Sequence, residues 1–440
     1  MKNIILNRIA YLILFISFTQ TLFSQTSWTK DPSNPVLKRD TVIAHLPNDL
    51  IAISDPFVIK EGTTYKMWYT CGGLNFPADT LLRSRICYAT SSDGIVWDKY
   101  EENPVLDVSY SGLWDSLGVE TASILIDSTA PVEEKYKMWY AGQYFNTYRY
   151  EIGYAYSADG INWIKYTEPV LPVGISTKWD NGFLEGPSVV KVDGMYKMWY
   201  CGYDAIPDGN STDGKANIGY AFSTDGINWT KYSENPVLIT GVDSWDSIYV
   251  QDPHVIYADG IYQMWYGGGD NDVTYNQQVG YATSTDGINW VKSPLNPVLK
   301  KGTTGEWDAI LASFPSVIND NGNYKMWYTG RNLDPIPENS LNYYWEVGYA
   351  AESFIGVQNY DINLFSISPN PSTNYINIEI SGENTSSEIT IYNLLGQIVY
   401  QVNLIQNHLQ IDTDELNNGM YIIECKRDNI SSSRIFTISR

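Results

Sequence analysis

One five-residue string recurs five times in this chain of 440 residues. It reads YKMWY at 65–69, 136–140, 196–200 and 324–328, and YQMWY at 262–266. The Trp residues of successive copies lie 60 to 71 residues apart. A repeat at this spacing indicates a solenoid, a propeller or another array in which each copy packs on its neighbours.

The segments after each string give the repeat its internal structure. A CYA or GYA string follows each copy, at 87–89, 153–155, 219–221, 280–282 and 348–350. Four copies continue into an Asp-Gly turn with a nearby Trp, at 91–97, 157–163, 223–229 and 284–290. An NPVL-like string closes each of these four copies, at 103–106, 168–171, 235–238 and 296–299. Asp-Gly between β-rich runs favours tight hairpins, so each copy is predicted to form four short strands, as a propeller blade does.

The fifth copy lacks the Asp-Gly turn and the NPVL string, and the missing piece lies near the N-terminus. Trp28, Lys30 and NPVL at 34–37 match Trp97, Lys99 and NPVL at 103–106. We therefore predict an all-β fold in which a five-bladed β-propeller over 26–357 is closed by its N-terminal strand. Closure removes the exposed edges of an open sheet. Most repeated Trp and Tyr residues are then expected to pack between blades, and function is expected where the blades differ.

Composition excludes several classes of partner. The chain has 28 Lys and Arg against 50 Asp and Glu, a formal charge of −22, so it lacks the basic face that nucleic acid or an anionic membrane needs. A content of 43% hydrophobic and 14% aromatic residues excludes a disordered chain. Four Cys residues without a CxxC motif or a Cys/His cluster exclude a zinc site and a disulfide scaffold. We expect a monomer.

The copies differ most in the strand before each YKMWY string. A Pro stands 12 residues before the Trp in four copies, at 56, 187, 253 and 315. Copy 2 lacks this Pro, but its ETAS string at 120–123 aligns with EGPS at 185–188. Four acidic residues then fall at the entrance of the strands in copies 1–4: Asp55, Glu120, Glu185 and Asp252. We expect them to meet in one layer at one end of the axial funnel. Crowded carboxyls raise one another's pKa values, so that one stays protonated while another is ionised, as glycoside hydrolysis requires. Calcium binding, capping of backbone amides and a solvated acidic funnel are the alternatives.

The Asp-Pro strand of copy 1, the Glu-Gly-Pro strand of copy 3, the SxDGxxW turns and the five-blade count resemble glycoside hydrolase family 43. The resemblance covers the whole propeller and extends to the invertase-like families, such as family 32, and the mannoside phosphorylases. It implies that Asp55 is the general base, that Glu120 adjusts pKa values, that Glu185 is the general acid, and that configuration is inverted.

This sequence departs from the family pattern at two of the four acids. The pKa-adjusting residue is usually Asp, whereas Glu120 lies in a strand with an insertion and no Pro, and Asp252 supplies a second Asp-Pro. A phosphorylase needs a basic phosphate pocket, and these strands offer only acids, which disfavours that activity.

Substrate specificity is expected to come from the unequal loops between the second and third strands, at 72–86, 141–151, 202–217, 267–278 and 330–346. Together with Asp252, we expect these side chains to bind substrate: Tyr144, Tyr203, Trp345 and Arg331, the last also as a candidate for balancing charge. Several of them are equally expected to pack the loops.

Neither a cofactor nor a metal ion is required by this chemistry. His254 lies two residues past Asp252, so both side chains are candidates for an axial calcium ion, although a hydrogen-bonded core His is the equal alternative. Cys71 and Cys87 bracket the first loop and are expected to form a disulfide or to remain two buried thiols.

The two ends of the chain indicate export. Lys2 and Arg8 precede an apolar run from Ile9 to Phe18, which predicts a signal peptide over 1–24 and no transmembrane span in the mature protein. Residues 365–440 alternate like the strands of a small β-sandwich. Their SPNP opening, NLLGQIV strand and LNNGMYII string resemble the type IX secretion sorting domain of Bacteroidota. A carbohydrate-binding module is disfavoured because 365–440 contains no Trp.

The sequence therefore predicts a secreted or surface-exposed glycoside hydrolase that reaches the outer membrane through the periplasm. Its expected partners are a carbohydrate substrate and the type IX secretion machinery, which reads 365–440. The alternative is a non-catalytic glycan-binding or surface-adhesion propeller exported by the same route.

Overall fold

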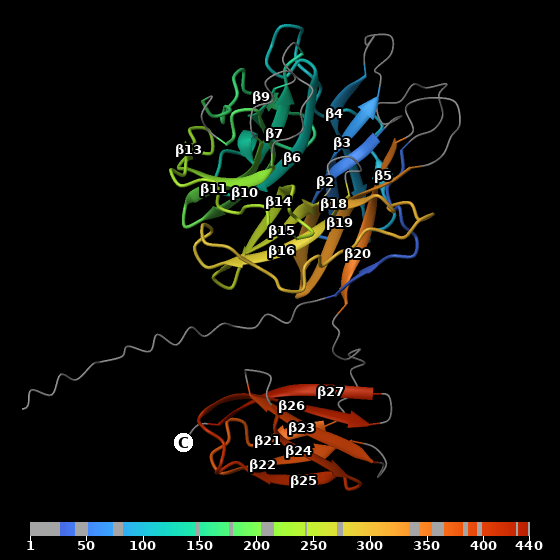
Figure 1. Ribbon diagram of the computed structural model, residues 1–440, viewed down its shortest axis with the longest axis vertical. Helices are drawn as coiled ribbons and strands as arrows, with labels where there is room; N and C mark the ends of the chain where they lie inside the picture. Colours follow the sequence, from blue (N-terminus) through green and yellow to red (C-terminus); the bar gives the residue numbers. More distant parts are fainter. Residues whose placement is uncertain are drawn as a thin grey trace, which may run out of the picture. The chain divides into compact units, whose positions relative to one another are not determined.

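The computed structural model describes most of the chain beyond the predicted signal peptide. The described residues are 27–39, 52–73, 82–145, 149–175, 179–203, 215–242, 244–270, 276–333, 343–353, 365–381, 386–393, 398–427 and 430–438. Residues 1–24 therefore lie outside them. The chain divides into two compact units, Ser27–Ser353 and a unit that contains the described residues from Phe365 onward (Figure 1).

The unit Ser27–Ser353 is built from antiparallel strands that pair in five sets of similar order. The first set contains β2 (Ala52–Glu61), β3 (Thr64–Gly73), β4 (Arg83–Ser91) and β5 (Asp98–Lys99). The second contains β6 (Gly118–Ile126), β7 (Tyr136–Gln143), β8 (Tyr150–Ser157) and β9 (Ile164–Lys165), with a 3₁₀ turn, η2 (Val132–Glu134), between β6 and β7. The third contains β10 (Phe183–Val192), β11 (Met195–Tyr203), β12 (Asn217–Ser223) and β13 (Thr230–Lys231).

The fourth and fifth sets repeat this order. The fourth contains β14 (Tyr249–Ala258), β15 (Ile261–Gly269), β16 (Gln277–Ser284) and β17 (Val291–Lys292). The fifth contains β18 (Leu311–Asp320), β19 (Asn323–Leu333) and β20 (Tyr343–Ser353), and β1 (Ser27–Lys30) pairs with β20 as its fourth strand. The first strands of the sets contact one another in a cycle, from β2 through β6, β10, β14 and β18 back to β2.

The N-terminal strand makes in the fifth set the contact that the fourth strand makes in three others. Lys30 Nζ on β1 lies 2.5 Å from Asp308 Oδ2, a carboxylate that is almost fully buried. The same Lys–Asp pair joins Lys165 to Asp115, Lys231 to Asp180 and Lys292 to Asp246. β1 therefore replaces the strand that the fifth repeat copy lacks in the sequence.

The repeated Trp residues pack between neighbouring sets, as the sequence predicts. Trp68, Trp139, Trp199 and Trp327 are completely buried. Each indole N–H donates to a glycine carbonyl in the Asp-Gly turn of another set, at Gly160, Gly226, Gly287 and Gly94 in that order. An indole in this position fills the space between two sheets and satisfies a buried turn carbonyl.

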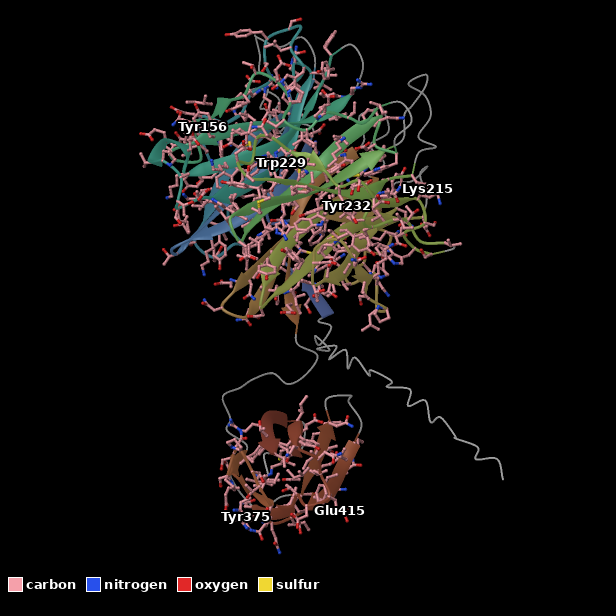
Figure 2. The ribbon with its side chains drawn as sticks, turned by 90° about the vertical axis from the view of Figure 1, so that its left-hand side faces the viewer. Tyr156, Lys215, Trp229, Tyr232, Tyr375 and Glu415 are labelled. Atoms are coloured by element: carbon pink, nitrogen blue, oxygen red, sulfur yellow. A yellow bond between two sulfur atoms is a disulfide. The ribbon has the colours of Figure 1, made fainter. Side chains whose placement is uncertain are left out.

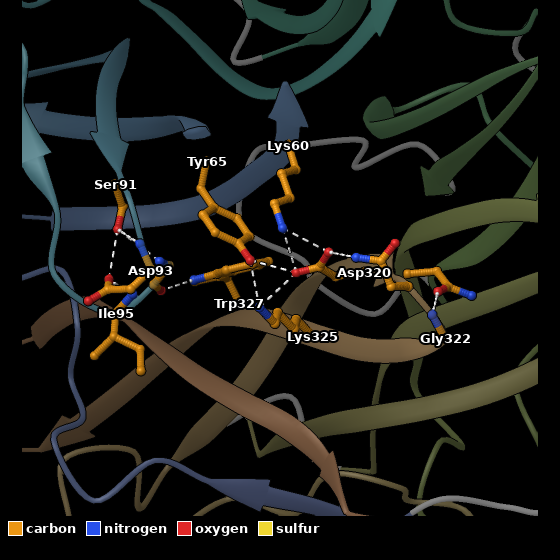
Figure 3. Close-up of polar contacts among 12 residues, drawn as sticks. Lys60, Tyr65, Ser91, Asp93, Ile95, Asp320, Gly322, Lys325 and Trp327 are labelled. Atoms are coloured by element: carbon orange, nitrogen blue, oxygen red, sulfur yellow. Dashed lines mark hydrogen bonds and ion pairs between the residues drawn. The ribbon is translucent and has the colours of Figure 1, made fainter. Parts of the chain in front are cut away.

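The junction between the fifth and first sets is shown in Figure 3. Trp327 donates to the Gly94 carbonyl at 2.8 Å. Asp320, at the end of β18, accepts hydrogen bonds from Lys60 Nζ, from Lys325 Nζ and, at 2.6 Å, from Tyr65 Oη. The first and fifth sets, which are far apart in the sequence, are thus joined by the same kinds of contact that join consecutive sets.

The second unit consists of two small sheets. β21 (Phe365–Ser368), β22 (Tyr375–Ile380) and β25 (His408–Asp412) form one sheet. The other contains β24 (Ile398–Leu404), β23 (Ser387–Asn393), β26 (Gly419–Arg427) and β27 (Ile430–Ile438). Buried Ile376, Ile389 and Phe436 belong to one apolar core shared by both sheets, whereas Tyr375 and Glu415 are exposed (Figure 2). This is the predicted β-sandwich.

The prediction of an all-β chain is confirmed for the described residues, whose only helical segment is the short turn η2. Within those same residues, no helix combines the length and apolar character of a membrane span.

Candidate active site

The first strand of every set carries a bulge at the same place. The pairing register shifts between Ser54 and Phe57 on β2, and the other four first strands shift at the equivalent step. One residue in each bulge has a left-handed φ: Asp55 at 50°, Thr121 at 52°, Gly186 at 54°, Asp252 at 47° and Phe314 at 52°. Left-handed φ is uncommon outside glycine, and bulges of this kind redirect side chains next to functional sites.

Four acidic side chains leave these bulges, and we call Asp55, Glu120, Glu185 and Asp252 the carboxylate cluster. Asp55 and Asp252 occupy the left-handed position, whereas Glu120 and Glu185 stand one residue earlier. The acids thus use two successive positions of the bulge, an offset already present in the Asp-Pro and Glu-Gly-Pro strings of the sequence. Asp55, Glu120 and Glu185 are partly exposed, while Asp252 is only 7% exposed.

The pKa values of Asp55 and Glu120 are raised by burial. The pKa of Asp55 is about 6, although hydrogen bonds from Thr70 and from Ser54, whose hydroxyl lies 3.0 Å away, oppose the rise. The pKa of Glu120 is about 7, because the charge of Asp55 adds to burial and a hydrogen bond from Tyr150 only partly offsets them. At neutral pH Asp55 is thus the more readily ionised of the two.

The other two carboxyls have pKa values raised well above the usual range. Burial is the main cause for Glu185, followed by the charges of Glu120, Asp252 and Asp55. Burial also dominates for Asp252, followed by the charge of Asp55. Among the described residues, no Lys or Arg offsets these rises. Because charges act this strongly only at short range, the structure brings the four carboxyls together.

Gly186 allows β10 of the third set and β14 of the fourth set to approach each other closely. A Cβ atom at Gly186 would lie 2.7 Å from Asp252 Oδ1 and 3.0 Å from Asp252 Cα. Glycine therefore serves both the left-handed φ and the close packing next to Glu185. A narrow cavity of about 40 Å³ lies at the bulges, lined by the left-handed residue of every set together with Phe57 and His254.

A hydrogen-bonded chain holds the buried Asp252 in place. Gln251 Nε2 donates to Asp252 Oδ2 at 2.7 Å and also contacts Gln277 Oε1 at 3.3 Å. Tyr203 Oη donates to Gln251 Oε1 at 2.7 Å, and the Asp252 amide donates to the Cys201 thiol. Tyr203, predicted to bind substrate, thus lies beside the carboxylate cluster and touches it through Gln251.

Sequence reasoning missed Tyr150, Gln251 and Gln277. Tyr150 donates to Glu120, and its ring packs edge-on against Phe183 at 5.6 Å. Tyr150 and Gln277 open the third strands of their sets, at the position that Ala216 or Trp345 holds in other copies. This position of the third strand differs between the copies, and that variation is the sequence signal for Tyr150 and Gln277.

Tyr144 is held within the packing of the second set. Its hydroxyl donates to Glu151 Oε2 at 3.2 Å, and its ring lies 6.5 Å from that of Trp114. These contacts, and not the carboxylate cluster, hold Tyr144 among the described residues, so the structure favours loop packing for this residue.

Arg331 and Trp345 form one wall in the fifth set, whose first-strand bulge carries no acid. The Arg331 guanidinium lies 4.8 Å above the Trp345 ring, and the two residues face each other across β19 and β20. The Trp345 ring in turn meets Phe314 edge-on at 6.2 Å. Arg331 is 6% exposed, and the charge-balancing role that the sequence suggests for it stays a prediction.

His254 has the environment of a core histidine. Its Nε2 hydrogen-bonds to the Val317 carbonyl at 2.8 Å, its ring packs on Phe57, and burial lowers its pKa to about 4. Within the described residues no group of three or more His, Cys, Asp or Glu could hold a metal ion. Asp252 and a neutral His do not fit calcium, which takes six to eight oxygen ligands. The axial calcium stays a prediction, and no step below uses it.

The cysteines divide into a pair and two single residues. Cys71 and Cys87 form a disulfide that joins β3 to β4, with Cα atoms 5.9 Å apart. This resolves the choice that the sequence left open. Cys201 and Cys425 are buried thiols.

Family models match both units. Residues 127–310 match the N-terminal domain of the glycosyl hydrolases family 32, and residues 366–439 match a secretion system C-terminal sorting domain. An uncharacterized protein of Mycobacterium tuberculosis is 26% identical over 242 residues, which cover 54% of this chain and 73% of that protein. A 1,2-β-oligomannan phosphorylase of Thermoanaerobacter is 23% identical over 180 residues, which cover 39% of this chain and 60% of the phosphorylase.

Solved structures share the fold of the larger unit. A glycosyl hydrolase from Bacteroides ovatus superposes with a TM-score of 0.57 at 16% identity, covering 74% of this chain and 93% of the other. A thermostable family-43 glycoside hydrolase gives a TM-score of 0.51 at 18% identity, with coverages of 68% and 88%. At these identities the likeness is one of architecture.

Proposed function

We propose, on the premise that this chain joins a propeller of the glycosyl hydrolase family 32 type to a secretion-system sorting domain, that it is an exported glycoside hydrolase. The sorting domain indicates export by type IX secretion to the cell surface or beyond. The predicted five-bladed propeller, closed by β1, is supported by the five strand sets, by the cycle of contacts among their first strands and by the Lys30–Asp308 pair.

The spread of pKa values within the carboxylate cluster carries the proposal. Hydrolysis with inversion needs one carboxylate that takes a proton from water and one carboxylic acid that donates a proton to the leaving oxygen. Asp55, with a pKa of about 6, is largely ionised at neutral pH, whereas burial and the neighbouring carboxylates raise the pKa of Glu185 well above its usual range and so favour its protonated form. Two carboxyls of one site are therefore ready for opposite roles.

The proposed reaction follows from these two states. A water molecule attacks the anomeric carbon while Asp55 accepts a proton from it, and Glu185 donates its proton to the departing glycosidic oxygen. Glu120 adjusts the pair, because its charge raises the pKa of Glu185 and its own pKa responds to Asp55. Two proton transfers and one displacement balance the reaction and invert the anomeric centre.

Substrate would enter between the carboxylate cluster and the aromatic wall of the fifth set. Trp345 offers a ring face already shared with Arg331, and Tyr203 offers a hydroxyl next to the buried Asp252. Rings of this kind bind sugar faces, and the polar groups around them fix orientation. Activity on a panel of substrates would identify the sugar and its linkage.

A phosphorylase is the second candidate, because a curated relative is a 1,2-β-oligomannan phosphorylase. Phosphate would then replace water as the nucleophile, and it would need cations close to the carboxylate cluster. The charges that raise the pKa values of Glu185 and Asp252 are those of other carboxyls, which would repel phosphate, and this favours hydrolysis.

The test compares Glu185→Gln and Asp55→Asn with wild type on a panel of aryl glycosides and polysaccharides, with and without inorganic phosphate. We expect Asp55→Asn to lose about a hundredfold or more in rate on every substrate, and Glu185→Gln to lose as much on polysaccharides, whose leaving oxygen needs a proton. Glu234→Gln, which changes an exposed acid outside the cluster, serves as the matched control. Unchanged rates in both cluster variants would refute the acid and base roles, sugar binding without turnover would favour the non-catalytic propeller, and phosphate-dependent turnover would favour the phosphorylase.

A further inference from the structure

A groove lies between the first and second strand sets, separate from the cavity at the bulges and from the carboxylate cluster. It encloses about 530 Å³, and its walls include Tyr100, Glu102, Glu133, Asn162, Trp163 and Ile164. None of these residues belongs to the carboxylate cluster. The volume lies within the range of about 300–1,000 Å³ typical of small-molecule sites and is large enough for a few sugar units.

One wall of this groove exists only in the second set. The other four sets join their first and second strands by a short turn, such as the one between Glu61 and Thr64. In the second set the connection runs from residue 127 to 135 and contains η2, which brings the exposed Glu133 to the groove. A feature confined to one copy of a repeat is not needed for the common packing, so it is a candidate for function.

The two aromatic side chains of the groove are held in fixed positions. Tyr100 packs edge-on against Tyr88 at 6.3 Å and donates its hydroxyl to Glu102 Oε2 at 2.9 Å. Trp163 donates its indole N–H to the Gly160 carbonyl and meets Trp68 edge-on. Both residues remain partly exposed. Aromatic rings that are already immobilised lose little further entropy on binding a ligand.

The polar groups of the groove are acids and an amide. Glu102, Glu133 and Asn162 are exposed, and no Lys or Arg is among the lining residues. Carboxylate and amide groups accept or donate hydrogen bonds to hydroxyls, whereas the negative charge repels uronates and sulfated sugars. Flat rings flanked by acceptors and without cations therefore fit a neutral glycan.

We propose that this groove is a second glycan-binding site that takes a neutral polysaccharide chain and holds it on the enzyme apart from the carboxylate cluster. The choice of a glycan rests on the proposed function, while the groove and its chemistry do not. A surface site of this kind keeps a secreted enzyme on its polymer between cleavages by raising the effective substrate concentration.

The experiment is affinity electrophoresis of the full chain in gels that contain a neutral polysaccharide, such as β-mannan, xylan or hydroxyethylcellulose, or the anionic polymer polygalacturonate. Every protein also carries Glu185→Gln, so that the polymer is not cleaved. Tyr100→Ala is expected to weaken retardation by the neutral polymer about tenfold, the size of one aromatic contact. Glu133→Ala, a change at an exposed turn that leaves the core intact, is expected to weaken it about threefold.

The next junction of the same unit offers a matched control. Tyr166 and Trp229, the latter labelled in Figure 2, stand at the positions of Tyr100 and Trp163, but no counterpart of η2 faces them. Tyr166→Ala is therefore expected to leave retardation unchanged. Equal effects of Tyr100→Ala and Tyr166→Ala, no effect of either Tyr100→Ala or Glu133→Ala, or retardation by polygalacturonate alone would each overturn the proposal.

The groove and the catalytic proposal fail separately. Turnover of a polysaccharide with retardation that ignores Tyr100→Ala would refute the groove and leave the hydrolase standing. Retardation that depends on Tyr100, together with no turnover of any panel substrate by the wild-type chain, would support the groove and count against the hydrolase.

Discussion

Two parts of the repeat share one backbone but use their side chains in opposite ways. One part, which we call the outer layer, comprises the Lys–Asp pairs and the Trp-to-glycine hydrogen bonds. The other part comprises the bulges of the first strands. In the outer layer, the same Lys–Asp pair and the same Trp-to-glycine hydrogen bond recur in four places. In the bulges, the left-handed φ recurs five times, between 47° and 54°, but the residue there is Asp, Thr, Gly, Asp or Phe. Of these two places, the repeat therefore preserves the backbone in both and varies the chemistry at the bulges.

This difference has an energetic side. The outer carboxylates have cationic partners, as Asp308 has Lys30. The carboxylate cluster has none among the described residues, and burial raises all four of its pKa values. The outer layer is thus arranged for stability, while the cluster stores unfavourable charge that a reaction can use.

The largest expected effect comes from breaking the outer layer. Trp199→Ala removes a completely buried indole and its hydrogen bond to Gly287, so we expect a loss of about 3–5 kcal/mol in the free energy of unfolding. Trp229→Ala, at a partly exposed indole, should cost clearly less. Urea denaturation measures both, and equal losses would contradict the packing role assigned to the repeated Trp.

A smaller effect is expected from Gly186→Ala in the bulges. The added Cβ would meet Asp252 Oδ1 at 2.7 Å and would carry a left-handed φ, so we expect about 1–3 kcal/mol of destabilisation together with lost turnover. Gly194→Ala is the matched control, because its φ is 78° but nothing lies within 4 Å of its Cβ. That variant should lose about 1 kcal/mol at most and keep its activity. Thermal denaturation and turnover with an active substrate separate the clash from the strain.

We expect Glu120→Gln to stabilise the protein, because burial and the charge of Asp55 make ionised Glu120 unfavourable in the folded state. Folding raises the pKa of Glu120 from 4.5 to about 7, so the folded state binds the proton more tightly. Stability from this group is complete below pH 4.5 and is lost as the pH rises through 7. Removing the titration should raise the free energy of unfolding at pH 7 by about 1–2 kcal/mol, after allowance for partial exposure. A variant no more stable than wild type at pH 7, or one whose advantage grows toward pH 4, would be inconsistent with the cluster as described.

The smallest effect is expected at the N-terminal strand. Lys30→Ala leaves the buried Asp308 without the ammonium 2.5 Å away, and we expect a loss of about 1 kcal/mol. Lys231→Ala removes the equivalent contact with Asp180 in the third set and should cost a similar amount. A far smaller loss for Lys30→Ala in chemical denaturation would show that β1 does not serve as the fourth strand of the fifth set.

The sequence predicted the repeated parts of this molecule better than the unique parts. Five copies of one string align well enough to reveal four strands per copy, the substitute strand near Trp28 and the four acids. It did not reveal the left-handed bulge from which the acids project, because a bulge changes the direction of a strand without changing the residue spacing. Tyr144 and Tyr150 look alike in the sequence, yet one packs its loop and the other donates to Glu120. Tyr144 follows the end of β7, whereas Tyr150 begins β8, and no local sequence pattern marks these two strand boundaries.

The central claim, that Glu185 donates the proton to the leaving oxygen, is tested most directly by varying the leaving group. Glu185→Gln and wild type are assayed on one glycone with dinitrophenol, which needs no protonation to depart, and with a sugar or alkyl alcohol, which does. The account predicts that Glu185→Gln keeps most of its rate with dinitrophenol and loses about a hundredfold or more with the alcohol. Equal losses with both leaving groups would contradict the assignment of Glu185 as the general acid.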